Sequence, residues 1–181
     1  MKMSNAVFFD RDGTINIDEG YTYKTMDLKF FSRAIKGLQM LSQSPFKLII
    51  ISNQSGIGKG YFKEEDYDAF MKEMIKQLKK EKVRIDAAYY CPHKPDDNCD
   101  CRKPRLGNVK KAQKEFNLDL KKSYIVGDKT EDIQTGINAG MKTIAVQTGN
   151  AVKDGKFNAA PDFTAKDLYE ASKFILKEDQ K

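Results

Sequence analysis

The sequence predicts an α/β protein with a doubly wound, mainly parallel sheet. Short apolar segments typical of strands alternate along the 181-residue chain with segments that have the periodicity of amphipathic helices. Such alternation implies crossover connections and helices on both faces of the sheet. Two of the expected strands contain uninterrupted apolar runs, at 48–51 and 124–126, as strands buried on both faces do. The length fits one domain spanning residues 1–181.

The individual elements follow in chain order. The expected strands cover residues 6–10, 47–52, 87–91, 124–126 and 143–146. The expected helices cover residues 34–41, 64–81, 106–116, 130–139 and 167–176. In the helix at 64–81, apolar side chains recur at three- and four-residue spacing, which indicates one core-facing stripe. Gly140 suits the end of the fourth helix, and Pro161 suits an irregular stretch before the last one.

Composition restricts the classes of function. The formal net charge of +6 favours anionic partners but does not choose between phosphorylated small molecules and nucleic acid. Much of the excess lies on lysines interleaved with acids at helical spacing, so we assign it to solvated helix faces. No apolar run approaches a membrane span and no signal-peptide pattern precedes the first strand, so we expect a soluble, cytoplasmic protein. Without a pattern of surplus apolar surface, we expect a monomer.

Chemically active side chains follow the expected strands, where ligands bind in open parallel sheets. These are Asp10 and Asp12 after the first strand, Ser52, Asn53, Gln54 and Ser55 after the second, Arg102 and Lys103 in the loop beyond the third, and Asp128 and Lys129 after the fourth. Because strand ends share one edge of the sheet, we expect these residues to form a single site.

Two carboxylates separated by one residue can divide the work of phosphoryl transfer. Asp10 can attack phosphorus to form an aspartyl phosphate, while Asp12 can protonate the leaving alkoxide and later deprotonate water. Asp10 and Asp128, with a backbone carbonyl near Asp12, form an oxygen site suited to Mg²⁺. Ser52 can donate its hydroxyl, and Lys103 its ammonium, to the phosphoryl oxygens. The pattern predicts Mg²⁺-dependent phosphoryl transfer.

The segment 91–101 contains every cysteine and the only histidine of the chain. Three thiolates and one imidazole make a tetrahedral Zn²⁺ set without an open position, which is typical of a structural site. Three cysteines cannot all pair in disulfides, and their clustering argues against unrelated reduced cysteines. We therefore expect Zn²⁺ on Cys91, His93, Cys99 and Cys101. The ion would brace the loop that carries Arg102 and Lys103 to the site.

Four groups of residues serve as motifs here: Asp10 with Asp12, residues 52–55, Arg102 with Lys103, and Asp128 with Lys129. In order and over nearly the whole chain, they closely resemble the signature motifs of the haloacid dehalogenase (HAD) superfamily of phosphohydrolases. Asp12 points to a phosphatase, because dehalogenases and ion-pumping ATPases of the superfamily lack this second carboxylate. Only one loop, one helix and one strand separate Asp10 from Ser52, which leaves no room for a cap domain. The resemblance implies a capless, HAD-like, Rossmann-related sheet with an open site.

Within the superfamily, the segments D-R-D-G-T-I-N, S-N-Q-S-G-I, C-D-C-R-K-P and V-G-D-K-x-x-D resemble the family that includes heptose bisphosphate phosphatases and histidinol-phosphate phosphatases. The resemblance implies Asp10 as nucleophile, Asp12 as acid and base, and Asp10, Asp12 and Asp128 around Mg²⁺. It also implies a phosphorylated small-molecule substrate. The residues expected to contact it are Asp18, Glu19, Gly20, Tyr21, Ser52, Asn53, Gln54, Ser55, Arg102, Lys103 and Lys129.

Charge favours one substrate over the other. Arg102, Lys103 and Lys129 supply more cations than one phosphate requires, which favours a sugar bisphosphate and removal of its 7-phosphate. Histidinol phosphate is the alternative, supported by the short 94–98 segment inside the cysteine-rich loop. Its cationic amine could meet Asp18 or Glu19, which could equally bind sugar hydroxyls.

Two further hypotheses come from other functional classes. A DNA 3′-phosphatase would need a basic groove with stacking aromatic residues, and only Tyr61 and Phe62 between Lys59 and Lys63 suggest one. A phosphate-binding protein that had lost catalysis would usually lack one of the four residues needed for the reaction. All four are present: Asp10, Asp12, Lys103 and Asp128. The glycine-rich segment 56–60 does not match a nucleotide-binding loop.

Overall fold

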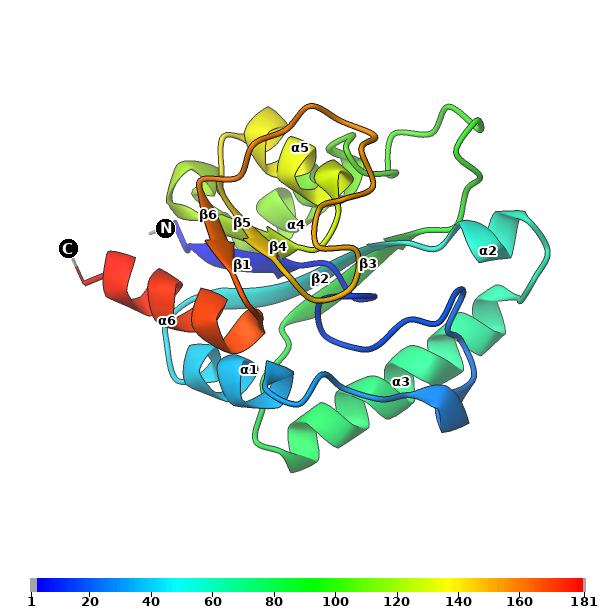
Figure 1. Cartoon of the computed structure of the whole chain (residues 1–181), viewed down its shortest axis with the longest axis horizontal. Helices are drawn as coiled ribbons and strands as arrows, with labels where there is room; N and C mark the ends of the chain where they lie inside the picture. Colours follow the sequence, from blue (N-terminus) through cyan, green and yellow to red (C-terminus); the bar gives the residue numbers. More distant parts are fainter. Residues whose placement is uncertain (1–2, 181) are drawn as a thin grey trace.

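The computed structural model describes residues 3–180 and contains one six-stranded sheet in the order β3-β2-β1-β4-β5-β6 (Figure 1). Its strands are β1 (Ala6–Phe9), β2 (Lys47–Asn53), β3 (Ala87–Cys91), β4 (Tyr124–Gly127), β5 (Lys142–Val146) and β6 (Phe163–Ala165). Every pair of neighbouring strands is parallel. The predicted α/β class and parallel sheet are confirmed.

The strand order reverses between β1 and β4, which are neighbours at the centre of the sheet. The chain runs outward from β1 through β2 to β3 and then returns to β4 on the other side of β1. Connections diverge at such a reversal and leave a crevice outside the carboxyl ends of the strands. Asp10 follows β1 directly and Asp128 follows β4 directly, so the topology brings both carboxylates to that crevice.

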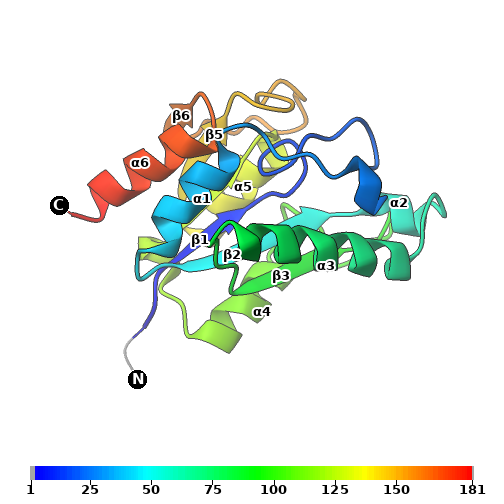
Figure 2. The same cartoon turned by 90° about the horizontal axis from the view of Figure 1, so that it is seen from below.

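Helices cover both faces of the sheet. One face carries α1 (Ala34–Ser42), α3 (Glu64–Lys80) and α6 (Leu168–Glu178), which Figure 2 shows in front. The other carries α4 (Gly107–Phe116) and α5 (Thr130–Ala139). The remaining elements are short: η1 (Thr25–Asp27), α2 (Ser55–Gly58) and η2 (Leu120–Lys122).

Alternating side chains of the strands build two apolar layers. In β1, Val7 and Phe9 pack on the side of α1, α3 and α6, while Ala6 and Phe8 pack on the side of α4. The central helix α3 buries its apolar stripe, which includes Phe70 and Met74, and leaves its lysines exposed. The stripe predicted from the sequence therefore faces the core.

The predicted helices and strands are all present, with ends that differ by at most two residues. Elements α2 and β6 were not predicted from the sequence. Strand β6 has only three residues, lies at the sheet edge beside β5, and follows an irregular connection that lacks a helix. Alternation cannot be recognised in so short a segment. Among residues 3–180, no helix combines the length and the hydrophobicity needed to cross a bilayer.

Candidate active site

Lys103 joins three segments beneath the carboxyl edge of the sheet. Its Nζ donates to Asp10 Oδ1 at 2.7 Å, to Asp132 Oδ1 at 2.6 Å and to the backbone oxygen of Ile51 at 2.9 Å. The residue is only 3% exposed. Burial alone would lower the pKa of Lys103, but the charges of Asp10 and Asp132 outweigh it and raise the pKa. The ammonium is therefore a permanent positive charge beside Asp10.

Asp10, Asp128 and Asp132 form a compact group of buried carboxylates. One oxygen from each lies within 4.8 Å of the others. Burial, together with the negative charge of Asp10, raises the pKa of Asp128 to about 6. Burial also raises the pKa of Asp132, although Lys103 opposes this shift. The raised pKa values express an excess of negative charge that a bound cation would relieve.

The two carboxylate oxygens of Asp128 differ, because one accepts hydrogen bonds and the other has no partner among the described residues. Its Oδ2 accepts hydrogen bonds from the backbone nitrogen of Asn150 at 2.7 Å and from the Asn150 side chain at 3.1 Å. Its Oδ1 is buried and has no hydrogen-bond partner within residues 3–180. Gly13, at φ +85°, packs so closely that a Cβ there would lie 2.2 Å from Asp128 Oδ2. Such an orphaned carboxylate oxygen beside Asp10 fits a hard divalent cation such as Mg²⁺.

Asp132 is less suited to bind a metal, because both of its oxygens already accept hydrogen bonds. Lys103 donates to Oδ1 at 2.6 Å, and the backbone nitrogen of Lys129 donates to Oδ2 at 3.0 Å. Asp132 therefore balances the charge of Lys103. Asp132 was not predicted as a site residue, although it ends the V-G-D-K-x-x-D motif.

The Asp12 carboxylate points to a different set of partners. Arg11 donates to it through two nitrogens, at 2.9 and 2.7 Å, and Asn16 and Gln54 each donate at 2.9 Å. Burial would raise the pKa of Asp12, but the charge of Arg11 and these hydrogen bonds outweigh it and lower the pKa. The Asp12 side chain is thus held ionised, outside the group formed by Asp10, Asp128 and Asp132.

Residues after β2 have different surroundings. Ser52 is buried, and its hydroxyl has no hydrogen-bond partner in the described chain. Asn53 accepts a hydrogen bond from the Lys103 backbone nitrogen at 3.0 Å and donates to the Lys103 backbone oxygen at 3.2 Å. Gln54 contacts Asp12, and Ser55 begins α2. Asn53 therefore positions the Lys103 loop, while the Ser52 hydroxyl is buried beside Tyr67.

Lys129 lies at the N-terminus of α5 and is half-buried. Burial would lower its pKa, but the charges of Asp10, Asp128 and Asp132 raise it. No salt bridge among residues 3–180 includes the Lys129 ammonium. It is a second cation near Asp10, next in sequence to Asp128.

The predicted substrate loop at 18–21 lies at the rim. Asp18 Oδ1 accepts hydrogen bonds from the backbone nitrogens of Gly20 and Thr22 at 3.2 and 3.1 Å, and from the Thr22 hydroxyl at 2.8 Å. Asp18 therefore shapes the loop. Glu19 and Gly20 are exposed, and Tyr21 is 42% exposed.

The cysteine-rich loop brings its four predicted ligands together. Cys91 Sγ lies 3.5 Å from Cys99 Sγ and 3.6 Å from His93 Nδ1, and Cys101 Sγ lies 3.3 Å from His93 Nδ1. Ligand atoms around a tetrahedral ion with Zn–S distances of about 2.3 Å would be roughly 3.7 Å apart. The cysteines form no disulfide. The donor set fits Zn²⁺, and the loop continues directly into Arg102, whose guanidinium donates to the His93 backbone oxygen at 3.5 Å.

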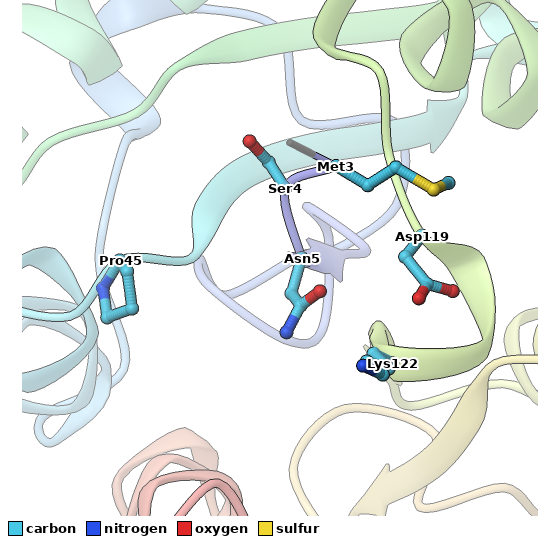
Figure 3. A pocket seen from close by; sticks show the side chains of 6 residues that line it. All are labelled: Met3, Ser4, Asn5, Pro45, Asp119 and Lys122. Carbon is cyan, nitrogen blue, oxygen red and sulfur yellow. The ribbon is translucent and has the colours of Figure 1, made fainter. Parts of the chain in front are cut away.

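A separate hollow of about 610 Å³ lies at the opposite edge of the sheet (Figure 3). Its lining residues are Met3, Ser4, Asn5, Pro45, Asp119 and Lys122. Ser4 and Asn5 precede β1, and Pro45 precedes β2, so the hollow adjoins the amino ends of the strands. It shares no residue with the group formed by Asp10, Asp128 and Asp132, and a hollow by itself is not evidence of an active site.

Three residues that contact the predicted carboxylates were missed besides Asp132. Arg11 lies between Asp10 and Asp12 in the sequence, so its place in the D-R-D motif could have indicated a role at the site. Asn16, which donates to Asp12, lies in the same conspicuous segment. Asn150 could not have been found, because it lies in the irregular connection after β5 and no motif surrounds it.

Comparison with known proteins identifies relatives over most of the chain. The family model described as "HAD-hyrolase-like" matches residues 100–171. The D-glycero-beta-D-manno-heptose-1,7-bisphosphate 7-phosphatase of Haemophilus ducreyi is 42% identical over 155 residues, which cover 81% of this chain and 85% of that protein. The D-glycero-alpha-D-manno-heptose-1,7-bisphosphate 7-phosphatase of Campylobacter jejuni is 40% identical over 154 residues, covering 85% and 88% respectively.

A solved structure agrees with these relatives. The D,D-heptose 1,7-bisphosphate phosphatase of B. bronchiseptica, complexed with magnesium and phosphate, superposes with a TM-score of 0.87 at 28% identity. The match covers 96% of this chain and 99% of that one. The predicted HAD membership is confirmed, because relatives about 40% identical match most of this chain and most of their own length. The chain belongs to the family of D-glycero-D-manno-heptose-1,7-bisphosphate 7-phosphatases.

Proposed function

We propose that this protein removes the 7-phosphate of D-glycero-D-manno-heptose 1,7-bisphosphate through an aspartyl phosphate on Asp10. The observation that carries the proposal is the position of the Asp10 carboxylate, which Lys103 binds at 2.7 Å and which has an oxygen within 4.8 Å of a carboxylate oxygen of Asp128. The names of the relatives support the substrate.

Asp10 is prepared to act as the nucleophile. Lys103 engages only its Oδ1, and no hydrogen bond within residues 3–180 engages Oδ2, which is left to attack phosphorus. The three N–H groups of the Lys103 ammonium already donate to Asp10, Asp132 and Ile51, so its positive charge would attract the phosphoryl oxygens electrostatically. Lys129 adds a second positive charge beside the transferring group.

Mg²⁺ would be held by Asp10, by the available oxygen of Asp128 and by the backbone oxygen of Asp12. Bound there, it would reduce the repulsion between an anionic nucleophile and an anionic substrate. Asp132, with both oxygens occupied, would instead keep Lys103 in place.

Asp12 exchanges protons in both steps. Held ionised by Arg11, it can take the proton of the water that attacks the phosphoenzyme. The first step, transfer of the phosphoryl group to Asp10, needs a protonated Asp12 that gives its proton to the leaving alkoxide. A phosphate dianion bound nearby favours that form, because a like charge raises the pKa of a carboxyl group.

Zn²⁺ on Cys91, His93, Cys99 and Cys101 would have no open position and would act on structure alone. We propose that it fixes the loop from which Lys103 reaches Asp10. Reduced cysteines used as ligands suit a reducing compartment, so we place the enzyme in the cytoplasm.

The test is phosphate release from both anomers of heptose 1,7-bisphosphate, from histidinol phosphate and from a 3′-phosphorylated oligonucleotide, assayed side by side with Mg²⁺. We expect the heptose substrates to give the highest kcat/KM. A preference for histidinol phosphate or for the oligonucleotide would replace the proposed substrate.

Variants test the chemistry separately from the substrate. Asp10→Asn should abolish turnover because an amide is a poor nucleophile, and Asp12→Asn should lower kcat by at least about 100-fold because it cannot exchange the proton. Asp27→Asn, a change at an exposed carboxylate in η1, is the control. An unsubstituted protein inert on every phosphomonoester would favour a phosphate-binding role.

A further inference from the structure

The guanidinium of Arg11 is buried against a segment of α3 that carries two aromatic rings. Its central carbon lies 4.6 Å from the centre of the Phe70 ring and 5.5 Å from the centre of the Tyr67 ring. Its Nη1 lies 4.0 Å from Met71 Sδ, which is a weak acceptor. All three helix residues are themselves buried. We call Tyr67, Phe70 and Met71 the α3 cage.

The α3 cage takes the place of water around a charge that has a single acidic partner. Within residues 3–180, the only salt bridge of Arg11 is to Asp12. Its Nε and Nη2 find oxygen acceptors, whereas the only acceptor that Nη1 reaches in the described chain is the Met71 sulfur. A desolvated guanidinium is attracted to the electron-rich face of an aromatic ring. The two rings therefore stabilise the charge on the side that faces α3.

The same contacts bear on the orientation of Asp12. The fork of Arg11 meets both Asp12 oxygens, at 2.9 and 2.7 Å, so a rotation of the guanidinium would break this two-point contact. Rings packed against the guanidinium oppose such a rotation. No residue of α3 forms a hydrogen bond with Asp12 within residues 3–180, so the helix acts on this carboxylate through Arg11.

Tyr67 is fixed to the sheet as well as to the helix. Its ring packs on the Tyr90 ring of β3, with centroids 4.1 Å apart, and the Tyr90 hydroxyl donates to Glu64 in the first turn of α3 at 3.1 Å. The Tyr67 hydroxyl is buried and has no hydrogen-bond partner in the described part of the chain. The ring of Tyr67, and not its hydroxyl, is thus the part that the contact with Arg11 uses.

We propose that Tyr67 and Phe70 are positioning residues that act through Arg11: their rings hold the guanidinium in the orientation that fixes the Asp12 carboxylate for proton exchange. The inference rests on the proposed function, because it concerns the acid and base of that reaction. The apolar stripe of α3, predicted from the sequence to face the core, then has a second role in its first half.

Phe70→Leu tests the inference, because it keeps the apolar character of the side chain and removes the ring. Exchange of the Arg11 Nε–H with solvent, measured by ¹⁵N NMR, reports how firmly the guanidinium is held. We expect Phe70→Leu to speed this exchange at least about tenfold and to lower kcat about tenfold, with KM changed less than about twofold. Tyr67→Leu should act in the same direction. Tyr67→Phe, which keeps the ring, should restore slow exchange and kcat.

Met74→Leu is the matched control, because Met74 is as fully buried as Phe70, lies one turn further along the same stripe and forms no hydrogen bond with Arg11 in the described chain. It should leave both the exchange rate and kcat unchanged. Equal effects of Phe70→Leu and Met74→Leu would overturn the inference, and so would fast exchange in Phe70→Leu with an unchanged kcat.

The exchange measurement needs no turnover, so it separates this inference from the proposed function. An unsubstituted protein that is inert on every phosphomonoester would contradict the proposed function. Fast exchange in Phe70→Leu would even then support the hold of the α3 cage on Arg11, and slow exchange would overturn it.

Discussion

At the scale of single residues, Arg11 shows how a buried charge can serve a site. It is 1% exposed, and its guanidinium lies 4.6 Å from the Phe70 ring centre. It donates hydrogen bonds to both carboxylate oxygens of Asp12, and it donates to the backbone oxygen of Thr22 at 2.9 Å. The planar fork of arginine allows this two-point contact, and the single ammonium of lysine does not.

We therefore predict that Arg11→Lys lowers kcat by roughly 10- to 100-fold with a smaller effect on KM, because Asp12 keeps a positive neighbour but loses its fixed orientation. Steady-state kinetics measure both constants. The control is Arg33→Lys at a half-exposed arginine whose guanidinium pairs with Asp167 at 2.9 Å, away from the carboxylates. An unchanged kcat in Arg11→Lys would show that the two-point contact does not matter.

Asn150 positions Asp128 in a comparable way. Asn150→Ala removes the side-chain hydrogen bond of 3.1 Å and keeps the backbone one. Loss of such a partner behind a metal ligand typically weakens binding by about tenfold. We expect calorimetry to show weaker Mg²⁺ binding. Asn158→Ala, at an exposed position in the same connection, should bind Mg²⁺ normally. Equal affinity in both variants would exclude the positioning role.

At the scale of elements, the irregular connection 147–162 replaces the usual crossover helix and is tied to the site at several points. Thr148 donates to the Gly13 backbone oxygen at 2.7 Å, and Val152 donates from its backbone to the Asp128 backbone oxygen at 2.6 Å. Asp154 accepts hydrogen bonds from the Thr130 backbone nitrogen at 2.8 Å and from the Thr130 hydroxyl at 2.7 Å. It thereby caps α5 from outside the helix.

Asp154→Ala should lower the free energy of unfolding by about 1 kcal/mol at pH 7, as loss of a capping carboxylate does. Burial would raise the pKa of Asp154, but the hydrogen bonds from Thr130 lower it. A lowered folded pKa gives stability that is present above the unfolded value of 3.8 and is lost as pH falls below it. Urea unfolding at both pH values should show that the difference in free energy of unfolding between Asp154→Ala and the unsubstituted protein is smaller at pH 3 than at pH 7. A constant difference would contradict the assignment.

The cysteine-rich loop makes a second prediction at this scale. Removal of Zn²⁺ by a chelator, followed by addition of excess Mg²⁺, should lower activity at least about tenfold, because the loop that delivers Lys103 loses its brace. Elemental analysis should find about one zinc per chain before treatment. Full activity in zinc-free protein would show that Asn53 and the protein contacts alone hold Lys103.

Most of the fold could be predicted because periodicity and topology determine it. Strand ends in a parallel sheet share one edge, which is why Asp10 and Asp128 could be placed together from sequence, while Lys103, in the loop beyond β3, was placed with them through its motif. Asn150 could not be placed, since its contact with Asp128 depends on the path of an irregular segment. The orientation of the Asp12 carboxylate toward Arg11, away from the other carboxylates, was likewise not encoded in any spacing.

At the scale of the whole molecule, the buried carboxylates couple stability to pH. In the metal-free protein, burial raises the pKa of Asp128 from 3.8 to about 6. Between these values the folded chain keeps a proton that the unfolded chain has released, so stability falls as pH rises through this range.

In the proposed site Mg²⁺ would bind the ionised carboxylates, so its stabilising effect should grow as pH rises. We predict that saturating Mg²⁺ raises Tm more at pH 8 than at pH 5, measured by differential scanning calorimetry. Ca²⁺-free buffers and an equal ionic strength of NaCl provide the control. An equal increase at both pH values would indicate that Mg²⁺ binds away from Asp128.

The three hydrogen bonds of Lys103 join positions that are 93, 52 and 29 residues away from it in sequence. They form only when β1, β2 and α5 have all docked, so no isolated fragment of the polypeptide can assemble Asp10, the proposed nucleophile, with its counter-ion. Catalytic rate should therefore disappear early during gradual denaturation, ahead of the circular dichroism signal of the helices. Turnover becomes a sensitive reporter of the last native contacts to be established during refolding.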